Sequence, residues 1–196
     1  MAEENIERIA AYLDRLDIKV DVSNDFNSRL KVQKITYLLE KLFKSLSKSY
    51  EEPYKLDNFF FHAQGPYSKQ LTRDYFDDMS AFKNTPKVAL SGLELTELDR
   101  TKDLLTIASP LILEIMASLL FVKDELGDKG SDWENVENGL KAKKPYLRDQ
   151  DVWIAEERLK EFLLTEKEAK RLSKEIMDEM EPFDKAASED FIKTGF

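Results

Sequence analysis

The stretch FHAQGPYSKQL, residues 61–71, holds two side chains that could form a nucleophile and its base. His62 is the only histidine of the chain, and Ser68 follows it across a Gly-Pro turn. Such a pair can form from any spacing in the sequence, so a hydrolase is one hypothesis. However, Ser68 stands where a helix N-cap is expected, and His62 adjoins an aromatic run typical of a strand, where we expect it to be half-buried. These structural roles explain both residues, and we therefore predict that the protein is not an enzyme.

The sequence lacks the residues that most cofactor and metal sites need. There is no cysteine, which excludes disulfides, zinc fingers and iron–sulfur clusters. The chain also lacks the HExxH motif and both glycine-rich phosphate-binding motifs. Its acidic runs do not have EF-hand spacing, and we interpret them as solvated faces: Asp77-Asp78, Asp149 with Asp151, and Asp178-Glu179 with Glu181. We therefore expect no cofactor and no bound metal.

Glu114 is the only charged residue in the apolar stretch LLTIASPLILEIMASLLFV, residues 104–122. A carboxylate on an apolar helix must be solvated, paired or protonated. We expect Glu114 to face solvent or to pair with Arg148 or a lysine, although a functional acid is the other hypothesis. Pro110 interrupts the stretch, and the remaining part, about 12 residues long, is too short to cross a bilayer core of roughly 30 Å. The stretch therefore predicts a buried helix.

The start of the chain, MAEENIERIAAYLDRLD, alternates charged and apolar residues. It has neither the basic region nor the apolar region of a secretory signal. We therefore expect a cytoplasmic location and no membrane partner.

Hydrophobic periodicity predicts a mainly α-helical domain with a small two-stranded β element. In the N-terminal half, apolar residues recur at helical spacing in three segments, and two short apolar runs are typical of strands. Gly65-Pro66 is expected to end the first strand, and Ser68 to cap the helix after it. The predicted elements are helices over 3–17, 28–49 and 69–83 and strands over 58–63 and 86–90. This order, helix, strand, helix and wing, resembles that of a winged helix.

Capping residues predict where the helices of the C-terminal half begin and end. Pro110 is suited to the first position of one helix, and Gly127 to its C-cap. Thr96 to Asp99 predict the start of a helix that ends near Ser109, and Ser131 with Glu134 predicts the start of a short helix. A further helix is predicted over residues 149–164. Thr165 with Glu168 predicts the start of an acidic helix over 165–181. We predict one domain over residues 1–185 and a frayed tail over 186–196.

A DNA-binding regulator is the alternative that the winged-helix order raises. The net charge of −9 opposes phosphate binding, although residues 27–50 are locally basic. Lys31, Lys34 and Lys41 would be the contacts to nucleic acid. The helix that would enter the groove has three basic and three acidic residues, so phosphates would repel its carboxylates. We therefore favour a protein partner over nucleic acid.

Three short motifs resemble the Panacea and SocA-like domain group and the related YwgA-like proteins. The first is a K-x-Q-K helix with Lys31, Gln33 and Lys34, and the last is the Ala117-Ser118 pair of a later helix. Between them, an aromatic strand ends in Gly65, Pro66, Tyr67 and Ser68. The likeness covers residues 28–163, and the helix over 165–181 looks like an addition.

The resemblance implies a small helical domain without catalytic activity. Such a domain acts as an antitoxin, or as an adaptor that holds a toxin or another protein client, sometimes for delivery to a protease. The stiff, aromatic turn provides more ring surface than a corner needs, which favours a role in binding that client. The candidate partner-binding residues are Phe60, His62, Gly65, Pro66, Tyr67 and Ser68. A homo-oligomer is compatible with the same surface.

Overall fold

The computed structural model describes residues 2–84, 88–165, 168 and 171 of the 196-residue chain. The chain divides into two compact units, Met1–Phe162 and Leu163–Phe196. The helix predicted over 165–181 and the tail predicted over 186–196 lie outside the described residues, apart from three positions. Thr165 and Glu168 form the predicted capping box, because each side chain accepts the backbone N–H of the other residue.

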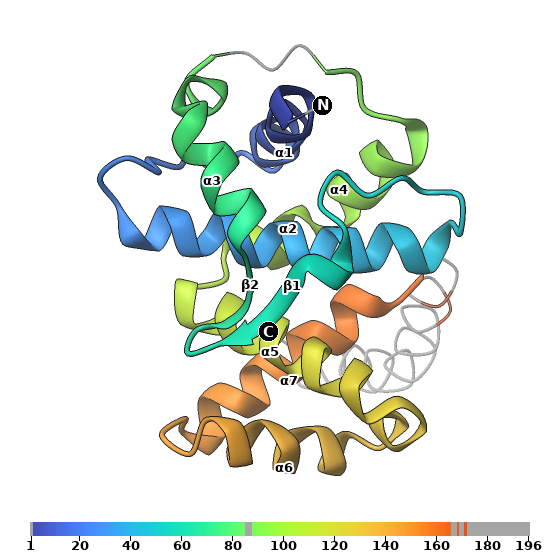
Figure 1. Ribbon diagram of the computed structural model, residues 1–196. Helices are drawn as coiled ribbons and strands as arrows, with labels where there is room; N and C mark the ends of the chain where they lie inside the picture. Colours follow the sequence, from blue (N-terminus) through green and yellow to red (C-terminus); the bar gives the residue numbers. More distant parts are fainter. Residues whose placement is uncertain (1, 85–87, 166–167, 169–170, 172–196) are drawn as a thin grey trace, which may run out of the picture. The chain divides into compact units, whose positions relative to one another are not determined.

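The described residues are mainly helical with one small antiparallel sheet, as the sequence predicts (Figure 1). In chain order the main elements are α1 Ala2–Arg15, α2 Phe26–Leu46, β1 Phe59–His62, β2 Gly65–Ser68, α3 Lys69–Asp77, α4 Gly92–Thr106, α5 Pro110–Leu126, α6 Trp133–Lys143 and α7 Asp149–Leu163. Three short 3-10 turns connect them: η1 Leu56–Asn58, η2 Met79–Phe82 and η3 Gly127–Ser131.

Helices α2 and α5 form the centre of the core. In Figure 1 α2 crosses the middle of the unit, with the hairpin and α3 in front of it and α5 below. The N-cap of α2 is Asp25, whose carboxylate accepts the N–H groups of Asn27 and Ser28. Helix α5 begins with Pro110 and ends at Gly127, as predicted, and its apolar side chains pack almost completely inside. The stretch 104–122 is thus largely a core helix.

The two strands form a hairpin in which Phe59 lies opposite Ser68 and His62 opposite Gly65. A two-residue turn at 63–64 reverses the chain, so Gly65 and Pro66 begin the second strand instead of ending the first. The strand predicted over 86–90 is not its partner: residues 88–90 have no regular structure, and 86 and 87 lie outside the described part. Proline is tolerated here because β2 is an edge strand.

Several helix ends differ from their predicted positions: α1 ends at Arg15, α2 runs from Phe26 to Leu46, and α4 ends at Thr106. Helix α3 ends at Asp77, and a 3-10 turn follows it instead of further helix. Helix α4 begins four residues earlier than the Thr96 start, because Ser91 and Glu94 form the capping box. The cap of α6 is Asp132 instead of its neighbour Ser131. Neighbouring side chains can all act as caps, so the local sequence does not choose among them.

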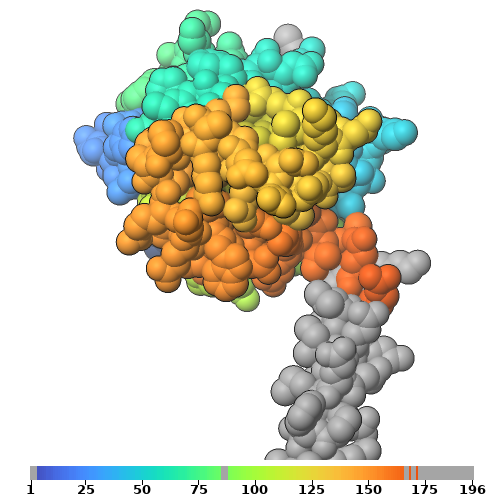
Figure 2. Space-filling model, turned by 90° about the horizontal axis from the view of Figure 1, so that it is seen from below, coloured from blue at the N-terminus to red at the C-terminus, as the bar shows by residue number. Residues whose placement is uncertain are grey.

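Helices α6 and α7, coloured yellow to orange, cover the face shown in Figure 2, and the hairpin, in teal, lies along its edge. The connection between these helices reaches the hairpin, since the Tyr146 hydroxyl donates to the Ala63 carbonyl at 3.2 Å. None of the helices that the structure describes has both the length and the apolar composition of a membrane span.

Candidate functional site

Two side chains of α2 hold the backbone of β2. The Gln33 side chain accepts the Ser68 N–H at 2.9 Å and donates to the Ser68 carbonyl at 3.1 Å. Lys34 donates from Nζ to the Pro66 carbonyl at 2.5 Å. These bonds satisfy backbone groups on the edge of β2 that faces away from β1, where the sheet has no third strand. The K-x-Q-K and Gly-Pro-Tyr-Ser motifs therefore form one structural unit.

The turn of the hairpin packs closely against α5. Gly65 has a φ of +79°, and a Cβ at this position would overlap the Ser118 hydroxyl and lie 3.3 Å from the Glu114 carbonyl oxygen. Ser118 is fully buried, and its hydroxyl donates to that same carbonyl at 2.7 Å. Residue 65 must therefore be a glycine, both because its φ is positive and because its backbone lies close to α5. The Ala117-Ser118 pair provides the small surface that makes this approach possible.

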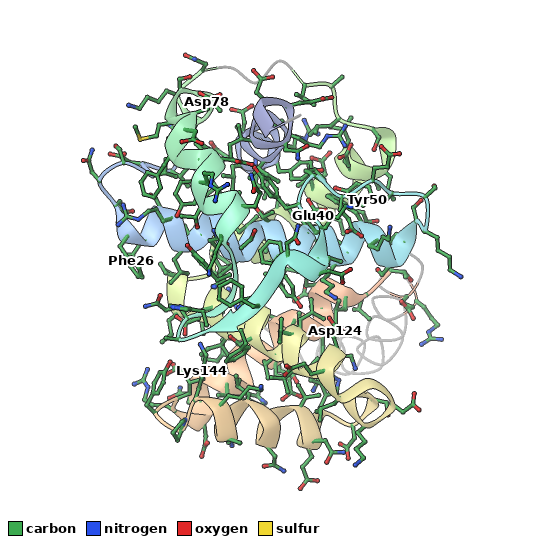
Figure 3. All side chains as sticks on the ribbon, in the orientation of Figure 1. Phe26, Glu40, Tyr50, Asp78, Asp124 and Lys144 are labelled. Carbon is green, nitrogen blue, oxygen red and sulfur yellow. The ribbon has the colours of Figure 1, made fainter. Side chains whose placement is uncertain are left out.

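Three buried charged side chains lie beneath the hairpin. Glu114 accepts from Lys144 Nζ at 2.5 Å, which confirms that the carboxylate pairs with a lysine. Arg148, the other predicted partner, binds Asp151 instead. Figure 3 labels Lys144, which lies below the hairpin.

Lys34 is the third member of this cluster, and it has no paired carboxylate. It is 2% exposed, and among the described residues no carboxylate oxygen lies within 4.0 Å of its ammonium group. Burial lowers the pKa of Lys34 to about 7, a shift that Glu114 opposes and the positive charge of Lys144 increases. Burial also lowers the pKa of Lys144, although its bond to Glu114 acts in the other direction. Lys144 is therefore paired with the carboxylate of this cluster, whereas the ammonium group of Lys34 is bonded to the Pro66 carbonyl.

Three rings form an exposed cluster on the outer side of the hairpin, which we call the aromatic face: Phe60, His62 and Tyr67. Their centroids are 5.5 Å apart for Phe60 and Tyr67 and 5.5 Å apart for His62 and Tyr67. Lys69 places its ammonium group 5.5 Å from the Phe60 centroid. Phe59 points to the opposite side and packs on Tyr37, as expected for alternating strand residues.

A cleft of about 80 Å³ adjoins the aromatic face at the start of α2. We call it the α2 cleft, and Figure 3 shows one of its walls, Phe26, at the end of that helix. Three aromatic rings line it, from Phe26, Tyr67 and Tyr75. The other walls are the basic side chains Arg29 and Lys34, the imidazole of His62, the amides of Gln33 and Gln64, and Leu30. Within the described part of the chain no carboxylate lines this cleft.

The predicted site residues separate into two groups. Phe60, His62 and Tyr67 reach the surface, and His62 is exposed instead of half-buried. Gly65, Pro66 and Ser68 are buried and shape the hairpin. The Ser68 hydroxyl accepts the Leu71 N–H at 3.2 Å, as the predicted helix cap. Because Ser68 pairs with Phe59 and His62 with Gly65, at opposite ends of the hairpin, the structure does not bring them together as nucleophile and base.

The lysines considered for nucleic acid do not form a continuous basic surface. Lys34 is buried, and Lys41 is paired with Asp124 at 2.7 Å. Lys31 is partly exposed. In the ranges that the structure describes, no group of three or more acidic or histidine side chains is arranged to hold a metal ion.

Sequence reasoning missed Arg29, Tyr75 and Lys144 as parts of these arrangements. Periodicity places Tyr75 on the apolar face of its helix, and composition places Arg29 in the basic stretch 27–50, but neither signal shows that the two residues line a cleft. Lys144 belongs to the run KAKK, in which nothing local distinguishes the buried lysine from its neighbours. For Lys34, its place in the K-x-Q-K motif was a usable signal, although the motif did not reveal burial.

A separate buried polar cluster lies farther along α2, near Glu40. The Tyr12 hydroxyl donates to Glu94 at 2.5 Å and shares a hydrogen bond of 2.8 Å with the Tyr50 hydroxyl. Glu40 lies near Tyr50 (Figure 3) and is fully buried, but no hydrogen bond of normal geometry reaches its carboxylate oxygens in the described part. Burial, followed by the charge of Glu52, raises the pKa of Glu40 well above its ordinary value.

Glu40→Gln is expected to increase the free energy of unfolding by about 1 to 3 kcal/mol at pH 8 and to change it little near pH 4.5. Above about pH 4.5 the Glu40 carboxyl keeps its proton in the folded protein, whereas the unfolded chain releases it. The free energy of unfolding of the wild-type protein therefore falls as the pH rises above this value. The amide removes that loss. Urea unfolding at the two pH values measures the effect, with exposed Glu51→Gln as the control. An equal gain at both pH values would contradict this account.

No protein-family model, curated protein or solved structure matches this chain. The resemblance to the Panacea group therefore stays a prediction that rests on its three motifs. The function must be inferred from the aromatic face and its supports.

Proposed function

We propose that this protein is a non-enzymatic interaction module of the cytoplasm, an antitoxin-like or adaptor domain that binds a protein client through the aromatic face. The observation that supports the proposal is the exposed cluster of Phe60, His62 and Tyr67 on a hairpin. Phe60 remains 38% exposed, although Phe59 beside it is buried. Aromatic residues of this kind supply much of the binding energy at protein interfaces.

The support of the hairpin favours binding with a small entropic cost. Gln33 and Lys34 hold the backbone of β2, and Gly65 sits directly on α5. The rings therefore stand on a backbone that is already ordered before a client arrives. Preorganisation of this kind increases affinity because fewer side chains and backbone angles must be ordered on binding.

The charges around the aromatic face indicate the kind of client surface that would fit. Lys69 lies beside Phe60, and Arg29 lies 6.0 Å from the Phe26 ring at the neighbouring cleft. Both cations bring positive charge close to the rings that would meet a client. We therefore expect a client patch with apolar or aromatic residues at its centre and acidic residues nearby.

Tyr67→Ala and Phe60→Ala are each expected to weaken client binding at least tenfold, because each removes a ring from the centre of the face. The client is first identified by affinity purification from the native host, and its Kd is then measured with purified proteins. Trp153→Ala is the matched control, since this 61% exposed ring lies on α7 and outside the aromatic face. It should change the Kd by less than about twofold.

Circular dichroism melting must show that the variants remain folded. Unchanged client affinity in both ring variants would overturn the proposed surface. Salt-dependent binding of duplex DNA by the wild-type protein, lost in Lys31→Glu or Lys41→Glu, would favour the regulator instead.

A further inference from the structure

The α2 cleft has a chemical character that differs from the rest of this acidic protein. The chain carries a net charge of −9, yet Arg29, Lys34 and His62 all line the cleft, and in the described part no carboxylate does. The nearest buried carboxylate, Glu114, is bound to Lys144. In the described part of the chain Lys34 is therefore left without a carboxylate partner.

The cationic groups at the cleft have hydrogen-bonding capacity to spare. An ammonium group has three N–H donors, and the bond to the Pro66 carbonyl uses one donor of Lys34. A guanidinium group has five, and the bond to the Val22 carbonyl, at 3.2 Å, uses one donor of Arg29. A buried ammonium group is strongly stabilised by an anion that reaches it in place of the lost water.

The size and walls of the cleft limit what that anion can be. At about 80 Å³ the cleft is well below the roughly 300 to 1,000 Å³ of typical ligand pockets, so only a small group can enter it. A carboxylate fits, whereas the body that carries it must extend along the rings of Tyr67 and Tyr75. These rings favour a flat or apolar body over a strongly hydrated one.

We propose that the α2 cleft binds a small organic carboxylate, with its anionic group at Lys34 and Arg29 and its apolar body against Tyr67 and Tyr75. The site shares His62 and Tyr67 with the aromatic face, but its anionic end is tested at Lys34 and Arg29, so either proposal can fail without the other. A free metabolite and a carboxylate of the client share this chemistry, and the experiments below separate the two sources.

Benzoate is the probe, because it joins a carboxylate to a ring, and benzamide is its neutral match in size. Titrations of the full chain are followed by NMR shifts of the Gln33 side-chain amide and by calorimetry. Benzoate should bind at least tenfold more tightly than benzamide, and more tightly than inorganic phosphate. Binding of benzamide or phosphate as tight as that of benzoate would overturn the proposal, as would an absence of benzoate binding at millimolar concentration.

Lys34→Met should weaken benzoate binding at least tenfold. Lys31→Met is the matched control, because Lys31 lies one turn earlier on α2 but does not line the cleft, and it should bind as the wild type does. Arg29→Gln removes the second cation at a less buried position, so it tests the site even if Lys34→Met unfolds. Full benzoate affinity in folded Arg29→Gln and Lys34→Met would refute the assignment.

The pH dependence gives a readout that a purely structural lysine would not produce. The groups that face Lys34 are Glu114 and Lys144 from below and Arg29, His62, Tyr67 and Tyr75 around the cleft. Because Lys34 loses its proton near pH 7 when the cleft is empty, benzoate affinity should fall as the pH rises from 7 to 9. The same series in His62→Gln should keep this fall, and its disappearance there would contradict the role of Lys34.

Client binding by Lys34→Met distinguishes the two sources of the carboxylate, because Lys34 lies outside the aromatic face. If the client supplies the carboxylate, Lys34→Met should weaken client binding as well as benzoate binding. If a free metabolite supplies it, Lys34→Met should weaken benzoate binding alone. A folded Lys34→Met variant that binds both as the wild type does would overturn the site.

Discussion

Gly65→Ala is expected to lower the free energy of unfolding by about 2 to 5 kcal/mol, the largest effect that we predict for a single methyl group. The residue has a φ of +79°, and a left-handed conformation costs a residue with a side chain about 1 to 2 kcal/mol. The added Cβ would also overlap the Ser118 hydroxyl, and overpacking of this kind costs about 1 to 3 kcal/mol. Urea unfolding with a far-UV signal measures the change.

Gly92→Ala is the control for this substitution. Gly92 is the first residue of α4, has no positive φ, and its new Cβ would meet nothing within 4 Å. The variant should be as stable as the wild type or slightly more stable. Ser118→Ala removes the hydroxyl that the new Cβ would overlap and keeps a good helix former in α5, so adding it to Gly65→Ala should recover the overpacking part of the loss but not the conformational part. Equal loss in the single and the double variant would show that the contact with Ser118 is unimportant.

Client binding provides a second measurement on the Gly65→Ala variant. At a temperature where Gly65→Ala is still folded, its hairpin should no longer sit correctly on α5. We therefore expect weaker client binding even from the folded protein, because Phe60 and Tyr67 are carried by that hairpin. Unchanged affinity would mean that the rings do not need this support.

Glu114→Gln should destabilise the protein by about 3 to 5 kcal/mol near pH 7. Glu114 is the only carboxylate within 4.0 Å of the Lys144 ammonium group in the described part. Its charge also favours the protonated form of Lys34. Two ammonium groups would then be buried with no anion between them. The loss is much larger than for a surface pair, because water cannot replace the missing partner.

The pH dependence of this loss has a definite sign. Both lysines have pKa values lowered by burial in the native state, whereas the unfolded chain holds these protons up to about pH 10.5. Stability therefore rises with pH in this range, and in Glu114→Gln the rise should be steeper. The deficit relative to the wild type should shrink between pH 7 and pH 10.

Two further variants give this prediction its controls. Asp99→Asn removes the carboxylate of the exposed Arg15 pair and should change stability little. Glu114→Gln combined with Lys144→Met removes both members of the buried pair and should be more stable than Glu114→Gln alone. A double variant that is as unstable as the sum of the two single variants would contradict the importance of the pairing.

Local signals in the sequence predicted much of the fold. The periodicity of α2, the proline at the start of α5 and the glycine at its end all report contacts within a few residues. Ser68 as a cap belongs to the same class, because its partner is the Leu71 N–H three residues later. The positions of caps were less certain where several suitable side chains stood together, as at Ser131 and Asp132.

The candidate site was only partly predictable. The sequence drew attention to residues 60–68, and it indicated that Glu114 would pair with a lysine. It did not show which phenylalanines of the run would be exposed, because that depends on the side of the hairpin that meets α2 and α5. It also placed Lys34 in a basic surface row, whereas the fold buries it under β2.

The amino-acid sequence by itself determined that this protein is mainly helical, has no cysteine chemistry and carries an aromatic turn before a capped helix. These properties depend on composition and on contacts between neighbours along the chain. Only the tertiary structure decided the pairing of Lys144 with Glu114, the burial of Lys34 and the walls of the α2 cleft. Those features join residues 30 or more positions apart, and their energies come from desolvation by the packed core, which no short stretch of sequence contains.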